Sequence, residues 1–402
     1  MRLHSDFRKI KIMNRNLAIV ALIAVVNALG YGIIIPILYS YSRQFGLSDF
    51  QNGLLFSTFA LCSFIATPVI GRLSDKYGRK PLLIFSLIGT AVSFFMAAWA
   101  PSAAFLFLAR ALDGATAGNI SVASAVIADT TDVKNRAKGF GLIGAAFGFG
   151  FVFGPAISAF AIGYSIKLPF IIAGSVSILA VLVTALFLPE TNKHIGQIEH
   201  KKLFDFPRLW HALFEGQVGR TLLISLLYAT SFGLFIYALQ PVALKVLHLT
   251  PQLLAVLFTV FGIAGLITQA IIFSRLTKRF KLTSLFTFAL FGVSIVFASL
   301  FFANIFSIFV GLCILLSLGN GIVNPLTQTI LSRETDAKSQ GSILGLQASY
   351  LSIGQIMGPI IGGTIALYSI QAPFLIASLF CVTSFLLSRN IILTVHKESA
   401  FS

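Results

Sequence analysis

Two charged residues with helical spacing stand inside an otherwise apolar stretch of this chain. Asp113 is the only carboxylate well within an apolar run, and Arg110 precedes it by three residues. Residues three apart share one face of a helix, so the two side chains can pair. An ionised and unpaired acid at the centre of a membrane costs about 3 kcal/mol on insertion scales. Two interpretations stay open: a static pair that lets the helix insert, or a coupling site that binds a proton or another cation.

A second charged motif, GRLSDKYGRK, fills residues 71–80 between two apolar runs. It contains Gly71, Asp75, Gly78, Arg79 and Lys80. An acid four residues before an arginine, at a helix–loop–helix corner, can pair with that arginine and cap a helix N-terminus. The motif can therefore fasten the ends of helices. The plainer alternative is a basic loop without a special role.

Signatures of other chemistry are missing from the sequence. Cys62, Cys313 and Cys381 lie in apolar runs without metal-binding spacing, and the six histidines are scattered. No HExxH, CxxC or GxSxG motif occurs, and no GxxxxGK[ST] loop could bind a nucleotide. We therefore expect no enzyme activity, no metal, no cofactor and no direct use of ATP.

The elements that carry these residues must lie in lipid. The chain of 402 residues is 57% hydrophobic and 10% charged, whereas a soluble domain has roughly 25% charged residues. About twenty apolar residues cross a bilayer as a helix, and an open strand would leave its backbone unsatisfied there. The pattern predicts an all-α protein with twelve spans, near 17–38, 52–70, 81–99, 103–128, 137–160, 168–188, 221–244, 252–274, 282–303, 305–331, 341–368 and 370–392.

The net charge of +16 follows the topology. If the first span starts inside the cell, all lysines and arginines except Arg43, Arg110, Lys167 and Lys245 fall in cytoplasmic segments. This bias predicts that both termini are cytoplasmic in a multi-pass protein of the bacterial inner membrane. It also removes the reason to expect a nucleic-acid partner. The basic N-terminus leads into a full-length span, so we expect no cleaved signal peptide.

The two halves of the chain repeat one another. GFGFVFGPAIS (148–158) and SIGQIMGPIIG (352–362) share the pairs Gly154-Pro155 and Gly358-Pro359, and the two prolines are 204 residues apart. Asp132 and Asp336 have the same offset. The pattern predicts a six-helix bundle at 1–188, a cytoplasmic linker at 189–220 and a second six-helix bundle at 221–402, with a site between the two bundles.

These motifs resemble the major facilitator superfamily over nearly the whole chain. GRLSDKYGRK is similar to its gating-loop signature, and ARALDGATAG (109–118) to its arginine-bearing fourth helix. GFGFVFGPAIS resembles an antiporter signature in which the proline bends the helix, although Ser158 and Ala159 replace its usual glycines. Residues 27–46 and 114–155 resemble the tetracycline-efflux branch of the drug:proton antiporters. That branch carries acids where this chain has Asn27 and Ser93.

The resemblance implies a twelve-helix major facilitator fold with a substrate cavity lined by the first, fourth, seventh and tenth spans. Polar residues that could line it are Asn27, Tyr31, Asn119, Tyr237, Gln240, Asn320, Asn324 and Gln347. Each of these can equally form an interhelical hydrogen bond. Apart from lipid, the expected partners are a small organic solute and a coupling proton, and the family default is a monomer.

Four functions remain to be separated. The leading hypothesis is proton-coupled efflux of a small organic or drug-like solute by alternating access. The alternative is a proton-independent facilitator or importer of a nutrient or metabolite, which the missing acids at Asn27 and Ser93 favour. A membrane enzyme would need an acid–base pair or a metal cluster, and a sensor would need an output domain. The sequence supports neither of these last two.

Overall fold

The computed structural model describes residues 2–192, 195–196, 206–335 and 339–391, and all regular structure in these ranges is helical. Helices satisfy their own backbone groups, which is what a chain of this hydrophobicity requires in lipid. In chain order the elements are α1 (Arg2–Arg43), α2 (Asp49–Tyr77), α3 (Arg79–Ala98), α4 (Ala103–Ala115), α5 (Asn119–Thr130), α6 (Val133–Ile162), α7 (Leu168–Phe187), α8 (Phe206–Ala212), α9 (Gly216–Pro241), η1 (Val242–Val246), α10 (Pro251–Ile267), η2 (Thr268–Ile272), α11 (Phe273–Arg279), α12 (Leu282–Phe301), α13 (Phe306–Arg333), α14 (Gln340–Ala366) and α15 (Ala372–Ser388).

Ten helical segments of the described chain are long and apolar enough to cross a membrane. Three of them join consecutive elements: α4 with α5, α9 with η1, and α10 with η2 and α11. The helical membrane fold is thus confirmed, whereas the count of twelve spans stays a prediction. The two further predicted spans correspond to α14, which is rich in glycine and serine, and to α15, which has only 17 residues.

The chain forms two compact units. The first is Met1–Leu203 together with Gln240–Ile263, and the second is Phe204–Leu239 together with Ala264–Ser402. The first unit therefore includes a segment from beyond the predicted linker. The predicted division at 189–220 stays a prediction, because residues 193–194 and 197–205 of that linker lie outside the described residues. Asp336 of the sequence repeat also lies outside the described residues.

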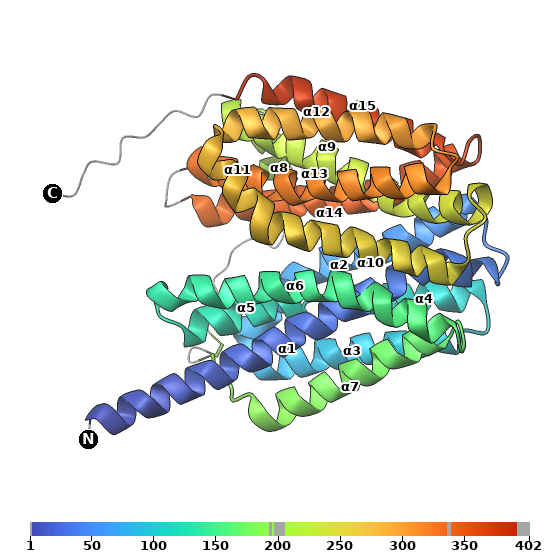
Figure 1. The fold of residues 1–402 in the computed structure, drawn as a ribbon. Coiled ribbons are helices and arrows are strands. Elements are labelled where there is room, and N and C mark those ends of the chain that lie inside the picture. The colour runs from blue at the N-terminus through green and yellow to red at the C-terminus, as the bar shows by residue number, and fades with distance from the viewer. Residues whose placement is uncertain (1, 193–194, 197–205, 336–338, 392–402) are drawn as a thin grey trace. The chain divides into compact units, whose positions relative to one another are not determined.

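In the first unit, α1 packs along α6 with very close backbone contact (Figure 1). A Cβ added to Gly154 would lie 2.7 Å from the carbonyl carbon of Gly32. One added to Gly150 would meet the backbone of Ala28 at similarly short range. Glycines at these positions let two helices approach closely, as in other membrane helix pairs. The Gly-Pro motif of α6 thus lies in a very close helix contact of this unit.

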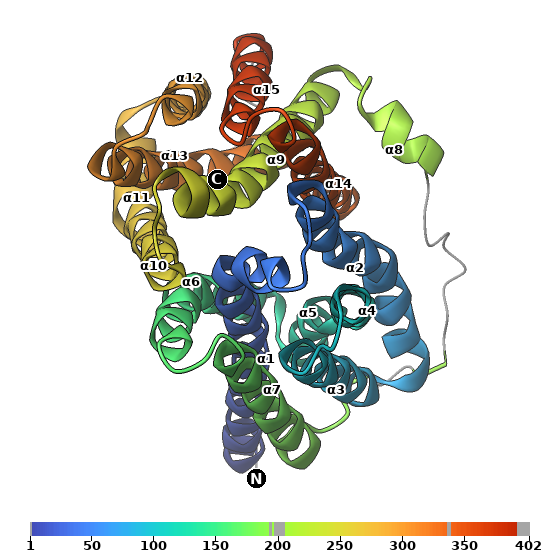
Figure 2. The same ribbon diagram turned by 90° about the vertical axis from the view of Figure 1, so that its right-hand side faces the viewer.

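The same contact recurs in the second unit, where α9 and α14 lie side by side (Figure 2). A Cβ on Gly358 would lie 2.7 Å from the carbonyl carbon of Gly233, and one on Gly354 would lie 2.7 Å from the amide nitrogen of Thr230. Gly32 and Gly233 are 201 residues apart, and Gly154 and Gly358 are 204 apart. The sequence repeat is therefore also a repeat of packing within each unit.

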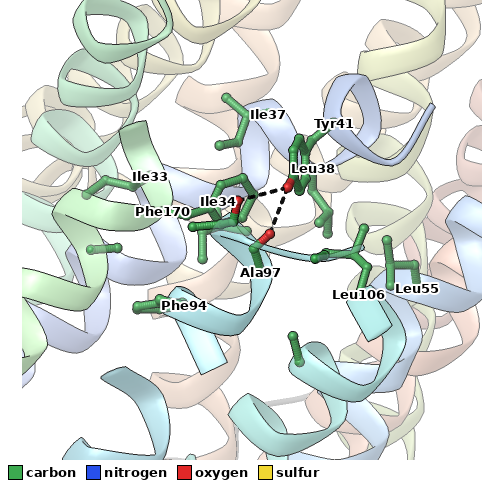
Figure 3. Close-up of a cluster of buried hydrophobic side chains, with 14 of the residues drawn as sticks. Ile33, Ile34, Ile37, Leu38, Tyr41, Leu55, Phe94, Ala97, Leu106 and Phe170 are labelled. Carbon is green, nitrogen blue, oxygen red and sulfur yellow. Dashed lines mark hydrogen bonds between the residues drawn. The ribbon is translucent and has the colours of Figure 1, made fainter. Parts of the chain in front are cut away.

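An apolar cluster fixes the positions of α1, α3, α4 and α7 at one end of the first unit (Figure 3). Ile33, Ile37 and Phe170 are at most 1% exposed in it. Tyr41 is equally buried, and its hydroxyl donates to the carbonyl oxygens of Ala97 (2.8 Å) and Ala98 (3.4 Å) at the end of α3. This bond satisfies a phenol that burial would otherwise leave unpaired.

Candidate functional site

The predicted pair of Arg110 and Asp113 forms near the end of α4. Arg110 Nη1 lies 2.7 Å from Asp113 Oδ2, and the two side chains are 8% and 9% exposed. Their spacing of three residues places both on one helical face. Arg110 Nε is buried and has no hydrogen-bond partner among the described residues. The arginine is therefore only partly satisfied, which leaves it one donor for another group.

Residues from four other helices lie around this pair. The guanidinium carbon of Arg110 lies 4.5 Å from the ring centroid of Phe59 on α2, in a cation–π contact. The Ser93 hydroxyl of α3 hydrogen-bonds to the Asp113 carboxylate. The ring of Tyr31 on α1 packs 6.1 Å from Phe59 and 5.9 Å from Phe151 of α6, centroid to centroid. The acid thus lies among an aromatic wall, one serine and one arginine.

The helix that carries this pair is interrupted directly after it. α4 ends at Ala115 and α5 begins at Asn119, with a turn between them. α2 packs tightly at the interruption, since a Cβ on Gly118 would meet the Cβ of Ile70 at 2.5 Å. Asn119 is fully buried, and within the part of the chain that the structure describes neither polar atom of its side chain has a hydrogen-bond partner. Asn27 of α1 is half-buried in the same unit.

The GRLSDKYGRK corner holds a charge cluster at the junction of α2 and α3. Arg79 Nη1 lies 2.6 Å from Asp75 Oδ1, and Arg79 Nε lies 3.0 Å from Asp129 Oδ2 at the end of α5. Arg79 Nη1 also donates to the Ser74 hydroxyl, at 2.7 Å. The expected acid–arginine contact is present, and Asp129 extends it to a third helix.

The N-terminal cap of α3 comes from Glu190 and not from Asp75. The backbone amides of Arg79 and Lys80 donate to Glu190 Oε1 (2.9 Å) and Oε2 (3.1 Å), respectively. A carboxylate in this position satisfies free amide groups and complements the helix dipole. Gly78 adopts a positive φ of 104°, and a Cβ there would contact Glu190. The glycine therefore allows both the turn and the cap.

The polar residues predicted in the C-terminal half form internal contacts. In the second unit, Asn320 Oδ1 accepts from the Tyr228 hydroxyl (3.1 Å) and from Asn324 Nδ2 (2.9 Å). Tyr237 is fully buried against Gly362, and Gln347 is 4% exposed. Gln240 belongs to the first unit, where its Oε1 accepts from the backbone amide of Tyr39 at 3.3 Å.

The structure thus brings together two groups of the predicted residues and adds members to each. Tyr31, Arg110 and Asp113 share one site in the first unit. Asn320 and Asn324 share another in the second unit. The sequence did not single out Phe59, Asp129 or Glu190 as functional, because each acts through contacts with residues at least 50 positions away. Ser93 was noted only as a missing acid.

Comparisons with known proteins agree with this architecture. The Major Facilitator Superfamily model matches residues 20–220 and 221–401. The class B tetracycline resistance protein of Escherichia coli is 29% identical, over 96% of this chain and 98% of its own. Multidrug resistance protein 1 of Bacillus subtilis is 30% identical, over 87% of this chain and 89% of its own.

A solved structure shows the same fold. The bacterial homologue of the human lysosomal transporter Spinster, in its inward-facing and unoccupied form, has a TM-score of 0.77 at 18% identity, covering 94% of this chain and 97% of its own. Ten apolar helical segments, together with bacterial resistance proteins as relatives, indicate a multi-pass protein of the bacterial inner membrane. The chain belongs to the major facilitator superfamily and is a membrane transporter.

Proposed function

We propose that this transporter exports a small, drug-like organic solute in exchange for protons, with Asp113 as the coupling acid and Arg110 as its counter-ion. Relatives named for resistance to tetracycline and to multiple drugs support efflux as the direction and drugs as the substrate class. The observation that carries the coupling role is a carboxylate, 9% exposed within an apolar helix, whose charge is balanced by Arg110.

The pair can link proton binding to a change of contacts. While Asp113 is ionised, the two charges cancel within the membrane. Protonation of Asp113 leaves Arg110 as an uncompensated buried cation, which is costly and drives it toward another partner or water. The Phe59 ring at 4.5 Å offers Arg110 an alternative contact, and Arg110 Nε, which has no partner among the described residues, is a donor for a further group. Loss of the proton restores the pair, so each proton bound and released can switch the site once.

The two halves 1–188 and 221–402 are proposed to alternate between two arrangements during transport, and the predicted polar residues are proposed to contact the substrate. The cluster of Asp75, Arg79 and Asp129 supports a gating role for the 71–80 loop, because three helix ends are fastened there by one arginine. Protonation of Asp113 can affect this cluster only if the cluster has two alternative arrangements.

The test uses purified protein in liposomes with an imposed proton gradient, and tetracycline and a quinolone as probes. We expect Asp113→Asn to abolish gradient-driven accumulation while leaving exchange of substrate for substrate intact. Asp132→Asn, which removes an exposed acid outside the site, is the matched control and should keep both activities. Full concentrative transport by Asp113→Asn would refute the coupling role.

One observation favours a second candidate, a proton-independent facilitator. Asp113 is already bound by Arg110 and Ser93, and Asn27 and Ser93 carry no charge. A static Arg110–Asp113 pair would only allow the helix to insert into the membrane. In that case the wild-type protein equilibrates its substrate across the membrane with or without a proton gradient, and Asp113→Asn lowers stability but not the final distribution of substrate.

A further inference from the structure

A compact polar cluster lies in the first unit at the opposite end of α2 from the 71–80 loop. Asp49 is the first residue of α2 and lies within a capping box formed by Ser48 and Gln51. Lys245 Nζ lies 2.8 Å from each of the two Asp49 carboxylate oxygens. The Tyr39 hydroxyl at the end of α1 donates to Asp49 Oδ1, and the Lys245 ammonium lies 5.8 Å from the Tyr39 ring centroid.

Each member of this cluster supports the others. Asp49 is placed at a helix N-terminus, where the dipole and free amide groups favour a negative charge. Its side chain is 14% exposed and that of Lys245 is 32% exposed, so the pair is shielded more than a typical surface pair. Lys245 is also one of four cations that the positive-inside pattern does not explain. Its pairing with Asp49 explains why a lysine is present at this end of the spans.

The segment that brings Lys245 here has the features of an element that can release. Gln240–Ile263 belongs to the first unit, although it follows the linker. Pro241, near its start, lies 205 residues after Pro36 of α1, close to the offset of the repeat. π-helical turns flank α10 on both sides, at Val242–Val246 and Thr268–Ile272. Such turns are rare and frequently mark functional sites, because they loosen the regular hydrogen-bond ladder.

Both polar and apolar contacts hold this segment in the unit. Polar contacts join Lys245 to Asp49 and Gln240 to the backbone of Tyr39. Apolar contacts include Ala255, which is fully buried in the same cluster as Ile33 and Ile37 of α1. Gly262 packs closely on α6, since a Cβ there would overlap the carbonyl oxygen of Phe151.

We propose that Asp49, Lys245 and Tyr39 form a latch, here called the Asp49 latch, that holds Gln240–Ile263 against α1 and α2, and that its opening is a step of transport. Only the statement that opening is a step of transport rests on the proposed function. The latch itself does not. The ion pair must break for the segment to leave, so the latch sets the balance between a closed and an open arrangement of this end of the protein.

The first experiment measures opening without any substrate. Ala255→Cys is introduced into a chain whose three native cysteines are replaced by alanine, and the rate of labelling by a water-soluble maleimide is recorded in liposomes. Asp49→Asn and Lys245→Gln should each raise this rate about three- to five-fold, as expected from losing a partly exposed ion pair. Tyr39→Phe should raise it less, because it removes one neutral donor.

Two variants separate the latch from general charge effects. Lys245→Arg keeps the cation and should label as slowly as the parent. Lys167→Gln removes an exposed lysine at the same end of the spans and should also leave labelling unchanged. Equal labelling of Ala255→Cys in the Asp49→Asn, Lys245→Gln and parent proteins would overturn the latch.

The second experiment tests the link to transport. Asp49→Cys with Lys245→Cys, joined by a short reducible cross-linker, should stop transport of tetracycline, and reduction should restore it. The single cysteine variants treated in the same way should remain active. Transport by the cross-linked protein at the uncross-linked rate would overturn the transport step while leaving the labelling result intact. Absence of transport in every sample, with the labelling response preserved, would instead reject the proposed function.

Discussion

The Arg110–Asp113 pair allows a stability prediction in which two mutations together cost less than either alone. Both side chains are less than 10% exposed, and Arg110 Nη1 lies 2.7 Å from Asp113 Oδ2. Charges about 4 Å apart attract by about 4 kcal/mol at an effective dielectric constant of 20. Removing one partner of a buried pair costs about 3 to 5 kcal/mol, because the remaining charge is left uncompensated.

The second estimate of this cost comes from the membrane itself. A single charged residue at the centre of a spanning helix costs about 3 kcal/mol on insertion scales. Arg110→Gln and Asp113→Asn should therefore each destabilise the protein by about 3 to 5 kcal/mol. The double variant leaves two neutral amides that can hydrogen-bond to one another. We expect it to cost no more than about 2 kcal/mol, since replacing both charges of a buried pair is often nearly neutral.

The assay is a double-mutant cycle on purified protein in detergent micelles, with unfolding followed by tryptophan fluorescence. The cycle isolates the pairwise energy if each single variant only removes the contact. The predicted coupling energy is about 4 kcal/mol or more, because the single costs add up to at least about 6 kcal/mol and the double variant costs at most about 2 kcal/mol. If the two single costs simply add in the double variant, the charges do not compensate one another and the reasoning is wrong.

Three further predictions follow from packing, burial and capping. Gly154→Ala should destabilise the protein by about 1 to 3 kcal/mol, because its Cβ would lie 2.7 Å from the backbone of α1, whereas Gly144→Ala, with open space around it, should be neutral or slightly stabilising in the same unfolding assay. Burial raises the pKa of Glu334, which lies just beyond the end of α13, above its ordinary value of 4.5. The folded state then holds this proton more tightly than the unfolded state, so stability falls as pH rises through the folded pKa. Glu334→Gln should therefore raise the melting temperature at pH 8 and leave it unchanged at pH 4, and an equal gain at both values would contradict this. Glu190→Gln should destabilise α3 by about 1 kcal/mol through loss of its charged cap, seen as faster hydrogen exchange of the Arg79 and Lys80 amides, and unchanged exchange would show that another group caps this helix.

Local sequence patterns located the residues that act within one helix or one corner. The spacing of Arg110 and Asp113, and of Asp75 and Arg79, is short enough that helix geometry alone brings each pair together. The repeat of Gly-Pro pairs was equally readable, because small residues at fixed offsets mark helices that approach closely. The charged pairs depend on spacings of three or four residues, and the repeat depends on one short motif that recurs 204 residues later.

Contacts between distant segments were not readable in this way. Glu190 caps α3 from 111 residues away, and Lys245 reaches Asp49 from 196 residues away. Neither residue stands in a motif, since a single acid or lysine can pair with any opposite charge that the fold brings near. The interpretation of Asp75 as a cap of the helix that follows it was wrong, because the acid that caps α3 comes from a distant segment. Asp75 is in the preceding helix and close in sequence, but Glu190 reaches the free amides.

The amino-acid sequence alone determined that this protein is helical, lies in lipid and repeats its packing twice, because hydropathy, charge placement and glycine spacing express these properties residue by residue. Only the tertiary structure decided that Phe59 lies on Arg110, that Glu190 caps α3, and that Gln240–Ile263 joins the first unit through the Asp49 latch. The physical reason is that burial in lipid restricts which residue types a position can hold, and this is visible in the sequence. Pairing depends instead on which of several chemically equivalent partners the folded chain places within a few ångströms.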